Sequence, residues 1–149
     1  MIYVTEKAKK KKRKSKVKTV FTKAKKKTAV ARAVIKKGKG TVFINKRSLS
    51  LIQPKELQDF VSEPLELAGP DFVSDVDISV KVAGGGFMGQ AVAARAAIAK
   101  ALASYSNDKK LKDAFLRYDR MLLVDDPRRK EKKKPLGVGA RRKKQSSKR

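Results

Sequence analysis

Cysteine, histidine and tryptophan are all missing from this sequence of 149 residues. Without cysteine there are no disulfides or thiolate nucleophiles, and without histidine there is no imidazole for general-base or zinc chemistry. No stretch approaches the roughly 20 apolar residues of a membrane-spanning helix, and the first residues lack the apolar core of a signal peptide. These absences exclude most hydrolase and metalloenzyme mechanisms. We therefore expect a soluble cytoplasmic protein.

Acidic residues are scarce at both ends of the chain. The sequence has 40 Lys plus Arg against 14 Asp plus Glu, a formal net charge of +26. Residues 1–27 have 13 basic residues and one acid, and residues 127–149 have 12 basic residues and one acid. The middle of the chain is therefore close to neutral. Because so large an excess of charge opposes a compact state, we expect a large anionic partner that neutralises it.

This charge distribution predicts three parts: a basic N-terminal extension at 1–27, a globular α/β domain at 28–126 and a basic C-terminal tail at 127–149. The two basic parts have too few apolar residues to offset the entropy of ordering, so we expect them to be disordered alone and ordered on a partner. The lysine runs could instead form a solvated helix face. In the tail, Pro135, Gly137 and Gly139 oppose a helix.

Three segments of the middle part have the alternation of apolar and polar residues that is typical of strands. Residues 29–35 and 42–44 alternate in this way around the turn residues 37–40, which predicts a β-hairpin. Residues 75–83 alternate most clearly, with four β-branched residues on one face, and predict a strand with one wet face. The segment 121–124, MLLV, predicts a short terminal strand.

Helical signals lie between and after these strands. Pro54 opens a short helix that we expect to end near Val61. Residues 91–103 contain eight alanines, which predicts a helix that can lie close to a sheet. A further helix, capped by Asn107, is expected to reach about Arg117. Strands and helices together predict a compact α/β layer.

The segment 84–89, GGGFMG, matches G-x-G-x-x-G between the predicted strand and the alanine-rich helix. A dinucleotide loop also needs a βαβ unit and an acid about 20 residues later at the end of a strand. Asp108 has that spacing but lies in the polar segment SNDKK, and no second βαβ half follows. Two interpretations stay open: the glycines shape a sharp turn, or the backbone amides at the helix start bind a phosphate of RNA.

Two pairs of carboxylates are the remaining candidates for chemistry. Asp75 and Asp77 share a strand face, and Asp125 and Asp126 are adjacent. A metal-binding or catalytic role is one interpretation. In so basic a chain, ion pairs that relieve local repulsion are the better one.

Several segments together resemble the S-nine family of ribosomal proteins of the small subunit. The resemblance covers about residues 20–149 and ends at the terminal Lys148-Arg149. The segments that carry it are KKKTAVARA (25–33), GKG with INKRSL (38–49), EPLEL (63–67), VAGGGFMGQAVAARAAIAKAL (82–102) and DDPRRKEKKKPLG (125–137). No single one of them is specific, but the combination is.

The resemblance implies a non-enzymatic protein in the head of the small ribosomal subunit, bound to ribosomal RNA and neighbouring ribosomal proteins, with no cofactor, metal or small-molecule substrate. It also implies a C-terminal tail that reaches the anticodon stem-loop of the peptidyl-site tRNA, with Lys148 and Arg149 as the contacts. The implied fold is a two-layer α/β (α+β) domain with a mixed sheet and helices on one face, like the second domain of ribosomal protein S-five. No membrane is involved.

The residue chemistry agrees with such a role, since Arg forks and Lys ammonium groups bind phosphates without reading base sequence. The predicted RNA-binding residues are Lys25, Lys26, Lys27, Arg32, Gly84, Gly85, Gly86, Gly89, Gln90, Arg128, Arg129, Lys133, Lys134, Arg141, Arg142, Lys143 and Lys144.

The chain departs from its relatives in three places. Ala24 stands where relatives have a glycine, Gln145-Ser146-Ser147 replaces an aromatic residue near the C-terminus, and residues 1–18 have no counterpart. From charge alone, a histone-like DNA-binding protein is the alternative function, because cationic arms on a small core suit any phosphate polymer.

Overall fold

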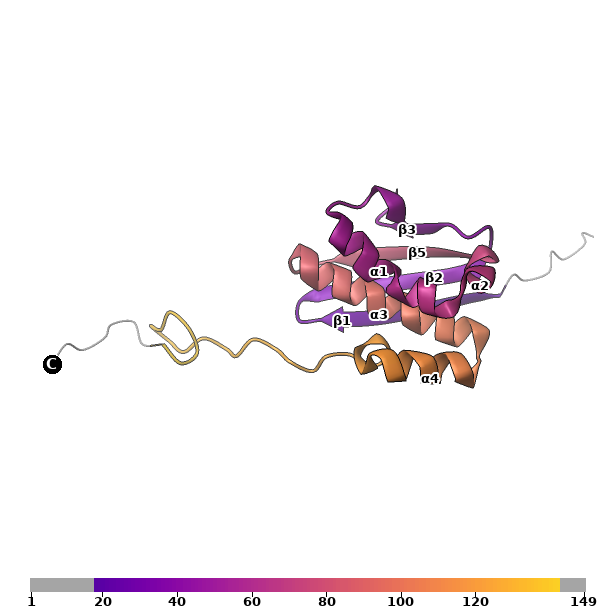
Figure 1. The fold of residues 1–149 in the computed structure, drawn as a ribbon. Helices are drawn as coiled ribbons and strands as arrows, with labels where there is room; N and C mark the ends of the chain where they lie inside the picture. The colour runs from indigo at the N-terminus through magenta and orange to yellow at the C-terminus, as the bar shows by residue number, and fades with distance from the viewer. Residues whose placement is uncertain (1–17, 143–149) are drawn as a thin grey trace, which may run out of the picture.

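The computed structural model describes residues 18–142 of the chain and shows one sheet with helices beside it (Figure 1). Two basic segments that the sequence analysis singled out, 1–17 and 143–149, lie outside the described residues. The strands are β1 (Thr19–Lys26), β2 (Ala29–Lys37), β3 (Val42–Ile44), β4 (Arg47–Ser48) and β5 (Val76–Ala83). The helices are η1 (Leu49–Leu51), α1 (Lys55–Ala68), α2 (Pro70–Ser74), α3 (Phe87–Ser106), α4 (Lys109–Tyr118) and η2 (Arg120–Leu122).

The sheet is mixed and has the strand order β1-β2-β5-β3-β4 within the described residues. β5 lies between β2 and β3, antiparallel to β2 and parallel to β3. The predicted hairpin between residues 29–35 and 42–44 is therefore wrong. The connection after β2 wraps around the start of β5 instead, where the Asp77 carboxylate accepts hydrogen bonds from the backbone N–H groups of Lys39 (3.0 Å) and Thr41 (3.2 Å). A local turn signal could not reveal a strand that comes 30 residues later.

The prediction that residues 1–27 form an unstructured extension is wrong for Thr19–Lys26, which is edge strand β1 and pairs with β2 along its whole length. Its inward side chains include Val20 and the fully buried Ala24. The hydroxyl of Thr22 donates to the carbonyl of Ala97 in α3 at 3.0 Å. Lysines alternate with these residues and hid the strand, although lysine is common on edge strands because it discourages further pairing.

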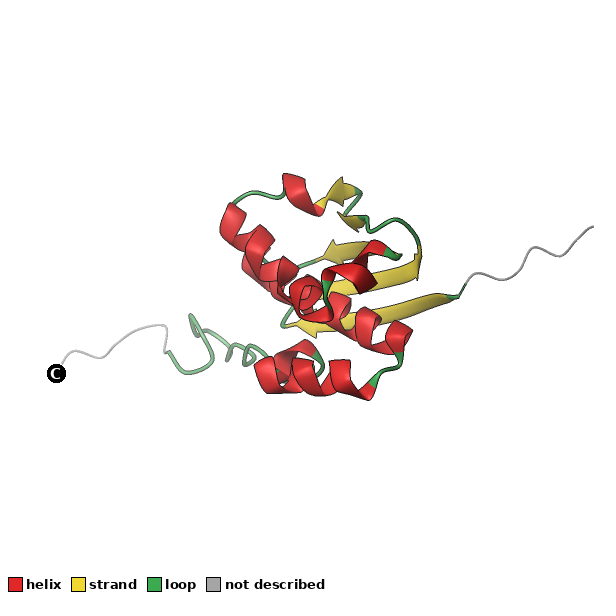
Figure 2. Ribbon diagram, turned by 45° about the vertical axis from the view of Figure 1, so that its right-hand side comes forward, coloured by secondary structure: helices red, strands yellow, loops and turns green. Residues whose placement is uncertain are grey.

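One face of the sheet is covered by helix α3, which packs on β1, β2 and β5. Its alanines are almost entirely buried and allow the helix axis to come close to strands whose inward residues are themselves small, such as Ala31 and Ala33. Helix α1 lies beside α3, and α4 contacts both, so all three helices are on the same side of the sheet (Figure 2). The predicted two-layer arrangement with helices on one face is confirmed; the likeness to ribosomal protein S-five stays a prediction.

The predicted helix after Pro54 exists, but α1 runs beyond Val61 to Ala68 and passes through Pro64. Proline usually ends a helix because it removes a backbone donor. Here Leu57, Val61 and Pro64 form the buried side of the helix. Burial of this apolar stripe offsets the lost hydrogen bond.

The strand expected at 121–124 is wrong: the chain there forms the short helix η2. The Asp119 carboxylate accepts from the N–H of Met121 at 2.8 Å and so favours a helical turn, and Leu122 is fully buried. The helix predicted near residues 107–117 is confirmed as α4. Its capping side chain is Asp108 rather than Asn107, because Asn107 has a left-handed φ of 56° that ends α3.

Arg95 of α3 is a buried cation that joins three elements. Its guanidinium donates to Asp119 at 2.7 Å, pairs with Glu63 of α1 and stacks on the Phe60 ring at 4.5 Å. Because a buried charge is tolerated only with partners, this cluster holds α1, α3 and the start of η2 in one arrangement.

After Pro127 the described chain, up to residue 142, has neither helix nor strand and runs away from the domain (Figure 1). The expectation that this part is not helical is confirmed for residues 127–142. Within the described residues, no helix is both long enough and apolar enough to cross a membrane.

Candidate nucleic-acid interface

The turn between β1 and β2 and the glycine loop before α3 meet at one end of the sheet. Strand pairing brings them together, because Val30 of β2 lies opposite Ala83, the last residue of β5. Both line a shallow hollow of about 280 Å³. Its lining residues are Lys26, Lys27, Thr28, Gly85, Gly86, Met88, Gly89 and Val92. Residues that the sequence analysis proposed separately, as lysines and as glycines, thus share one site.

Two of the loop glycines are required by the backbone. Gly84 and Gly85 have φ values of 76° and 68°, a left-handed region that other residues rarely adopt. A Cβ on Gly84 would also lie 2.6 Å from the carbonyl oxygen of Thr28, and one on Gly85 would lie 3.1 Å from the backbone nitrogen of Ala29. These glycines let the loop and the β1–β2 turn approach each other.

Gly86 has no such requirement. Its backbone is extended, with φ −95° and ψ 172°, and an added Cβ would meet no atom within 4 Å. The glycine therefore keeps open space beside the hollow rather than shaping the fold. The structural interpretation of the glycines therefore explains Gly84 and Gly85 but not Gly86.

Helix α3 begins directly after Gly86 and presents its positive end to this space. No side chain caps its N-terminus, and its first turn has no acidic residue. The first amide groups of any helix lack partners within it and carry a partial positive charge. Gln90, also predicted to bind RNA, turns its side chain back to donate to the carbonyl of Gly84 at 3.2 Å. It stabilises the loop in this structure.

The basic arm, residues 127–142, starts at the same end. The guanidinium of Arg129 donates to the carbonyl of Lys27 in the β1–β2 turn. Arg128 forms a two-pronged contact with Asp126, at 3.0 Å from Nε and 2.8 Å from Nη2, and Lys26 pairs with the same carboxylate. The arm is thus attached beside the lysines of the β1–β2 turn.

Asp126 is the buried acid of this end, with a side-chain exposure of 3%. The hydrogen bonds from Arg128, and then that from Lys26, hold its pKa well below the ordinary range. Its neighbour Asp125 pairs with Lys100 of α3 at 2.6 Å. These acids serve as ion-pair partners, which confirms that interpretation of the adjacent carboxylates. Within the part of the chain that the structure describes, no group of three acids could hold a metal ion.

Not all predicted site residues lie at this end. Arg32 is on the sheet face that the helices leave uncovered, beyond the hollow. Lys133, Lys134 and Arg142 are exposed along the arm, and Arg141 pairs with Glu131 at 2.8 Å. Four further predicted contacts, Lys143, Lys144, Lys148 and Arg149, fall outside the described residues.

Thr28 belongs to the site but was not predicted. It contributes a carbonyl that faces Gly84, and only the fold reveals that contact. Asp126 was predicted as an ion-pair partner but not as part of this site. Its position just before the basic residues around Arg128 was the available signal.

The geometry does not support a dinucleotide loop. After α3 the chain continues into α4 and η2, and no strand follows within the described residues to complete a second βαβ unit. Asp108, which has the spacing of a ribose-binding acid, accepts from the backbone N–H of Lys110 at 2.9 Å and caps α4.

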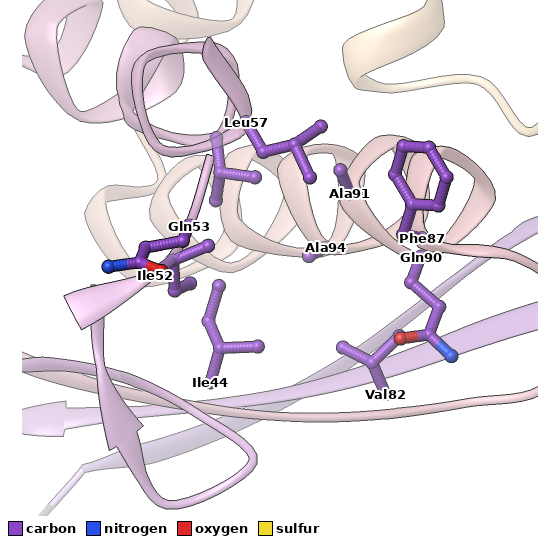
Figure 3. Close-up of a pocket in the computed structure, with 10 residues that line it drawn as sticks. Ile44, Ile52, Gln53, Leu57, Val82, Phe87, Gln90, Ala91 and Ala94 are labelled. Atoms are coloured by element: carbon purple, nitrogen blue, oxygen red, sulfur yellow. The ribbon is translucent and has the colours of Figure 1, made fainter. Parts of the chain in front are cut away.

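A second hollow, of about 170 Å³, lies between α1, β3 and the start of α3 (Figure 3). Ile44, Ile52, Leu57 and Val82 turn their side chains toward it, with Gln53 and Gln90 as its polar residues. No charged group lines it. It is a gap in the apolar packing, and it offers nothing that would bind a phosphate.

Two comparisons with known proteins agree. The family model described as Ribosomal protein S9/S16 matches residues 24–149 of the chain. A curated relative, the small ribosomal subunit protein uS9 of Halobacterium salinarum, is 48% identical over 126 residues, which make up 85% of this chain and 96% of the relative. The matched range includes the glycine loop, the three lysines at 25–27 and the arm.

Proposed function

Because the chain belongs to the Ribosomal protein S9/S16 family, we propose that it is a structural component of the small ribosomal subunit that binds ribosomal RNA through one end of its domain and its basic arm. The family is structural and not enzymatic. Its location is accordingly the cytoplasm, in the small subunit, with ribosomal RNA and neighbouring ribosomal proteins as its partners.

The observation that carries the proposal is the convergence of three phosphate-binding features at one end of the sheet. The uncapped start of α3, the lysines of the β1–β2 turn and the root of the arm surround one hollow. The N–H groups at the start of a helix point toward a phosphate and donate hydrogen bonds to it, and lysine ammonium groups attract it by their charge. Gly86 leaves room for a backbone phosphate to approach the amides.

The arm extends this surface along the RNA. Its described residues include exposed Lys133, Lys134 and Arg142 with no regular structure of their own. Ordering such a segment costs roughly 1–2 kcal/mol per residue, which contacts with phosphates offset. The arm therefore follows the shape of the RNA into which it is threaded.

For the end of the chain, we propose contact between Lys148 and Arg149 and the anticodon stem-loop of the peptidyl-site tRNA. The support is the family resemblance together with the chemistry of backbone contact, which suits every tRNA alike. Deletion of these two residues is expected to leave subunit assembly intact and to speed tRNA dissociation from the peptidyl site. Unchanged retention of tRNA by the truncated subunits would refute this contact.

The RNA-binding end is tested with a charge pair and a matched control. Lys27→Gln with Arg129→Gln removes two charges beside the hollow, and Lys109→Gln with Lys110→Gln removes two exposed charges from α4. Each phosphate contact that is lost reduces the log–log salt slope by about one unit. We expect the first pair, but not the second, to weaken binding to small-subunit ribosomal RNA and to flatten this slope. Equal behaviour of the two pairs would contradict the proposal.

Competition with duplex DNA at physiological salt separates this function from a histone-like one. A ribosomal protein prefers its folded RNA, whereas a general DNA-binding protein holds both polymers equally. Sedimentation of cell extract at moderate salt gives a second check, since the chain should travel with small subunits.

A further inference from the structure

The sheet face opposite α3 is not covered by helices, and it presents exposed phenylalanines and basic residues rather than a mixture of small polar side chains. Alternate residues of each strand point to it, and the register places them in rows that cross the strands. One row, the phenylalanine row, has a phenylalanine at each end, and the row beside it is cationic. This surface is separate from the hollow at the end of the sheet, and its interpretation rests on the RNA-binding function proposed above.

The phenylalanine row crosses four strands. Phe21 of β1 lies opposite Val34, Val34 lies opposite Ser79, and Ser79 lies opposite Phe43 of β3. The two rings are 74% and 40% exposed. Since neighbouring strands are about 4.8 Å apart, the two phenylalanines stand roughly 14 Å from each other. The row thus has an exposed ring at each end.

The cationic row is the next one along the strands. Lys23 lies opposite Arg32, and Arg32 lies opposite Lys81. All three side chains are exposed, and within residues 18–142 none of them forms an ion pair. Two residues of strand separate this row from the phenylalanine row, about 6.6 Å. A ligand that stacks on a ring can therefore reach a cation with an adjoining charge.

The strands place a single acid, Asp77, on this face. Its carboxylate already accepts hydrogen bonds from neighbouring groups. The hydroxyl and the backbone N–H of Thr41 and the N–H of Lys39 donate to its carboxylate, at 2.6, 3.2 and 3.0 Å. Lys25 and Lys36 add two further cations at the margins. The open face thus presents five basic residues against one acid.

We propose that the open face of the sheet binds unpaired nucleotides of RNA, with bases stacked on Phe21 and Phe43 and phosphates held by Lys23, Arg32 and Lys81. Unpaired bases expose the flat surfaces on which aromatic side chains stack, whereas bases in a helix do not. A protein partner fits less well, because the centres of protein interfaces are poor in charged residues. Here the cationic row lies directly beside the phenylalanine row.

The first test replaces Phe21 with benzoylphenylalanine, a photo-crosslinking residue, in the full chain assembled into small subunits. The control places it at Leu51, which has a similar exposure of 73% but lies in η1. Position 21 is expected to crosslink to ribosomal RNA. Crosslinks from position 21 to a protein alone, or none at all in assembled subunits, would overturn the proposal. Failure of the unsubstituted chain to enter small subunits would contradict the proposed function itself.

The second test measures the binding of the full chain to single-stranded RNA of about 12 nucleotides and to a duplex of the same length. Stacking of one base is worth about 1–3 kcal/mol, so Phe21→Ala with Phe43→Ala is expected to weaken single-strand binding by roughly tenfold or more. Duplex binding should change less than twofold, and Leu51→Ala should change neither. An equal loss for both RNAs, or no loss, would refute the stacking role.

Discussion

The globular domain and the basic arm differ in how their charged residues are paired. In the domain, cations next to the core have acidic partners: Arg95 has Glu63 and Asp119, and Lys100 has Asp125. In the arm, residues 127–142, Glu131 is the one acid among a run of exposed Lys and Arg. The domain thus obtains its order from burial and internal pairing. In the arm, Lys133, Lys134 and Arg142 have no acidic partner among the described residues and are available to an external one.

The junction between the two regions shows how one chain combines them. Asp126 is buried and neutralised by Lys26 and Arg128, while the next arginine, Arg129, reaches the carbonyl of Lys27. This arrangement fixes where the arm leaves the domain. It also brings the root of the arm next to the β1–β2 turn, which lines the hollow beside the start of α3.

The largest expected effect is on the domain. Arg95→Ala leaves Glu63 and Asp119 without their buried partner, and loss of one member of a buried ion pair costs roughly 3–5 kcal/mol. Urea unfolding should show this loss, while the exposed Arg117→Ala should stay within about 0.5 kcal/mol of the natural chain. Equal stability of the two variants would show that internal pairing does not hold the domain together.

Gly84→Ala is expected to have the next largest effect on stability. The substitution forces a left-handed φ on alanine, which costs about 1–2 kcal/mol, and its Cβ would lie 2.6 Å from the Thr28 carbonyl oxygen. Thermal unfolding would reveal the loss as a lower Tm. A variant as stable as the natural chain would mean that the loop does not depend on close approach to the β1–β2 turn.

Gly86→Ala should separate binding from folding. Its backbone suits alanine and nothing lies within 4 Å of the new methyl group, so stability should change by less than about 1 kcal/mol. The methyl group occupies the space through which a phosphate approaches α3, and affinity for small-subunit ribosomal RNA should fall several-fold. Unchanged affinity would remove the helix start from the RNA contact.

The smallest expected effect is on pH dependence. The hydroxyl of Thr41, followed by the backbone N–H of Lys39, lowers the pKa of Asp77 from 3.8 to about 2. A carboxylate with a lowered pKa in the folded state stabilises the fold above its unfolded-state pKa, and this stability is lost as the pH falls toward the folded value. Asp77→Asn should therefore reduce the slope of the free energy of unfolding against pH between about pH 4 and pH 2. A slope equal to that of the natural chain would contradict this.

Periodicity predicted the elements whose signals are local and strong. The alternation around Ile78 and the alanine pattern around Ala97 correspond to β5 and α3, and the loop between them lies where the glycines are. β1 was missed because its lysines looked like part of the basic extension, whereas alternate residues such as Ala24 are buried. The pairing of β2 with β5 depends on contacts distant in sequence, which turn signals cannot indicate.

The candidate site was predicted in its parts but not in its arrangement. Lys26, Lys27, the glycines and Arg129 were all expected to contact RNA, and the structure shows that they lie at one end of the sheet, whereas the side chain of Lys25 is on the open face. The open-face row of Lys23 and Lys81 was overlooked, because the two residues become neighbours of Arg32 only through strand register.

The most direct measurement compares the salt dependence of binding to small-subunit ribosomal RNA for the full chain and for a chain that ends at Arg129. The truncation keeps the junction but removes ten basic residues and one acid. Each phosphate that the arm neutralises contributes about −0.7 to −0.9 to the log–log slope, so the shorter chain should bind more weakly, with a slope shallower by several units and an unchanged Tm. An unchanged slope, or a domain that unfolds without its arm, would contradict the claim that the domain is stable by itself and that the arm supplies charges for RNA.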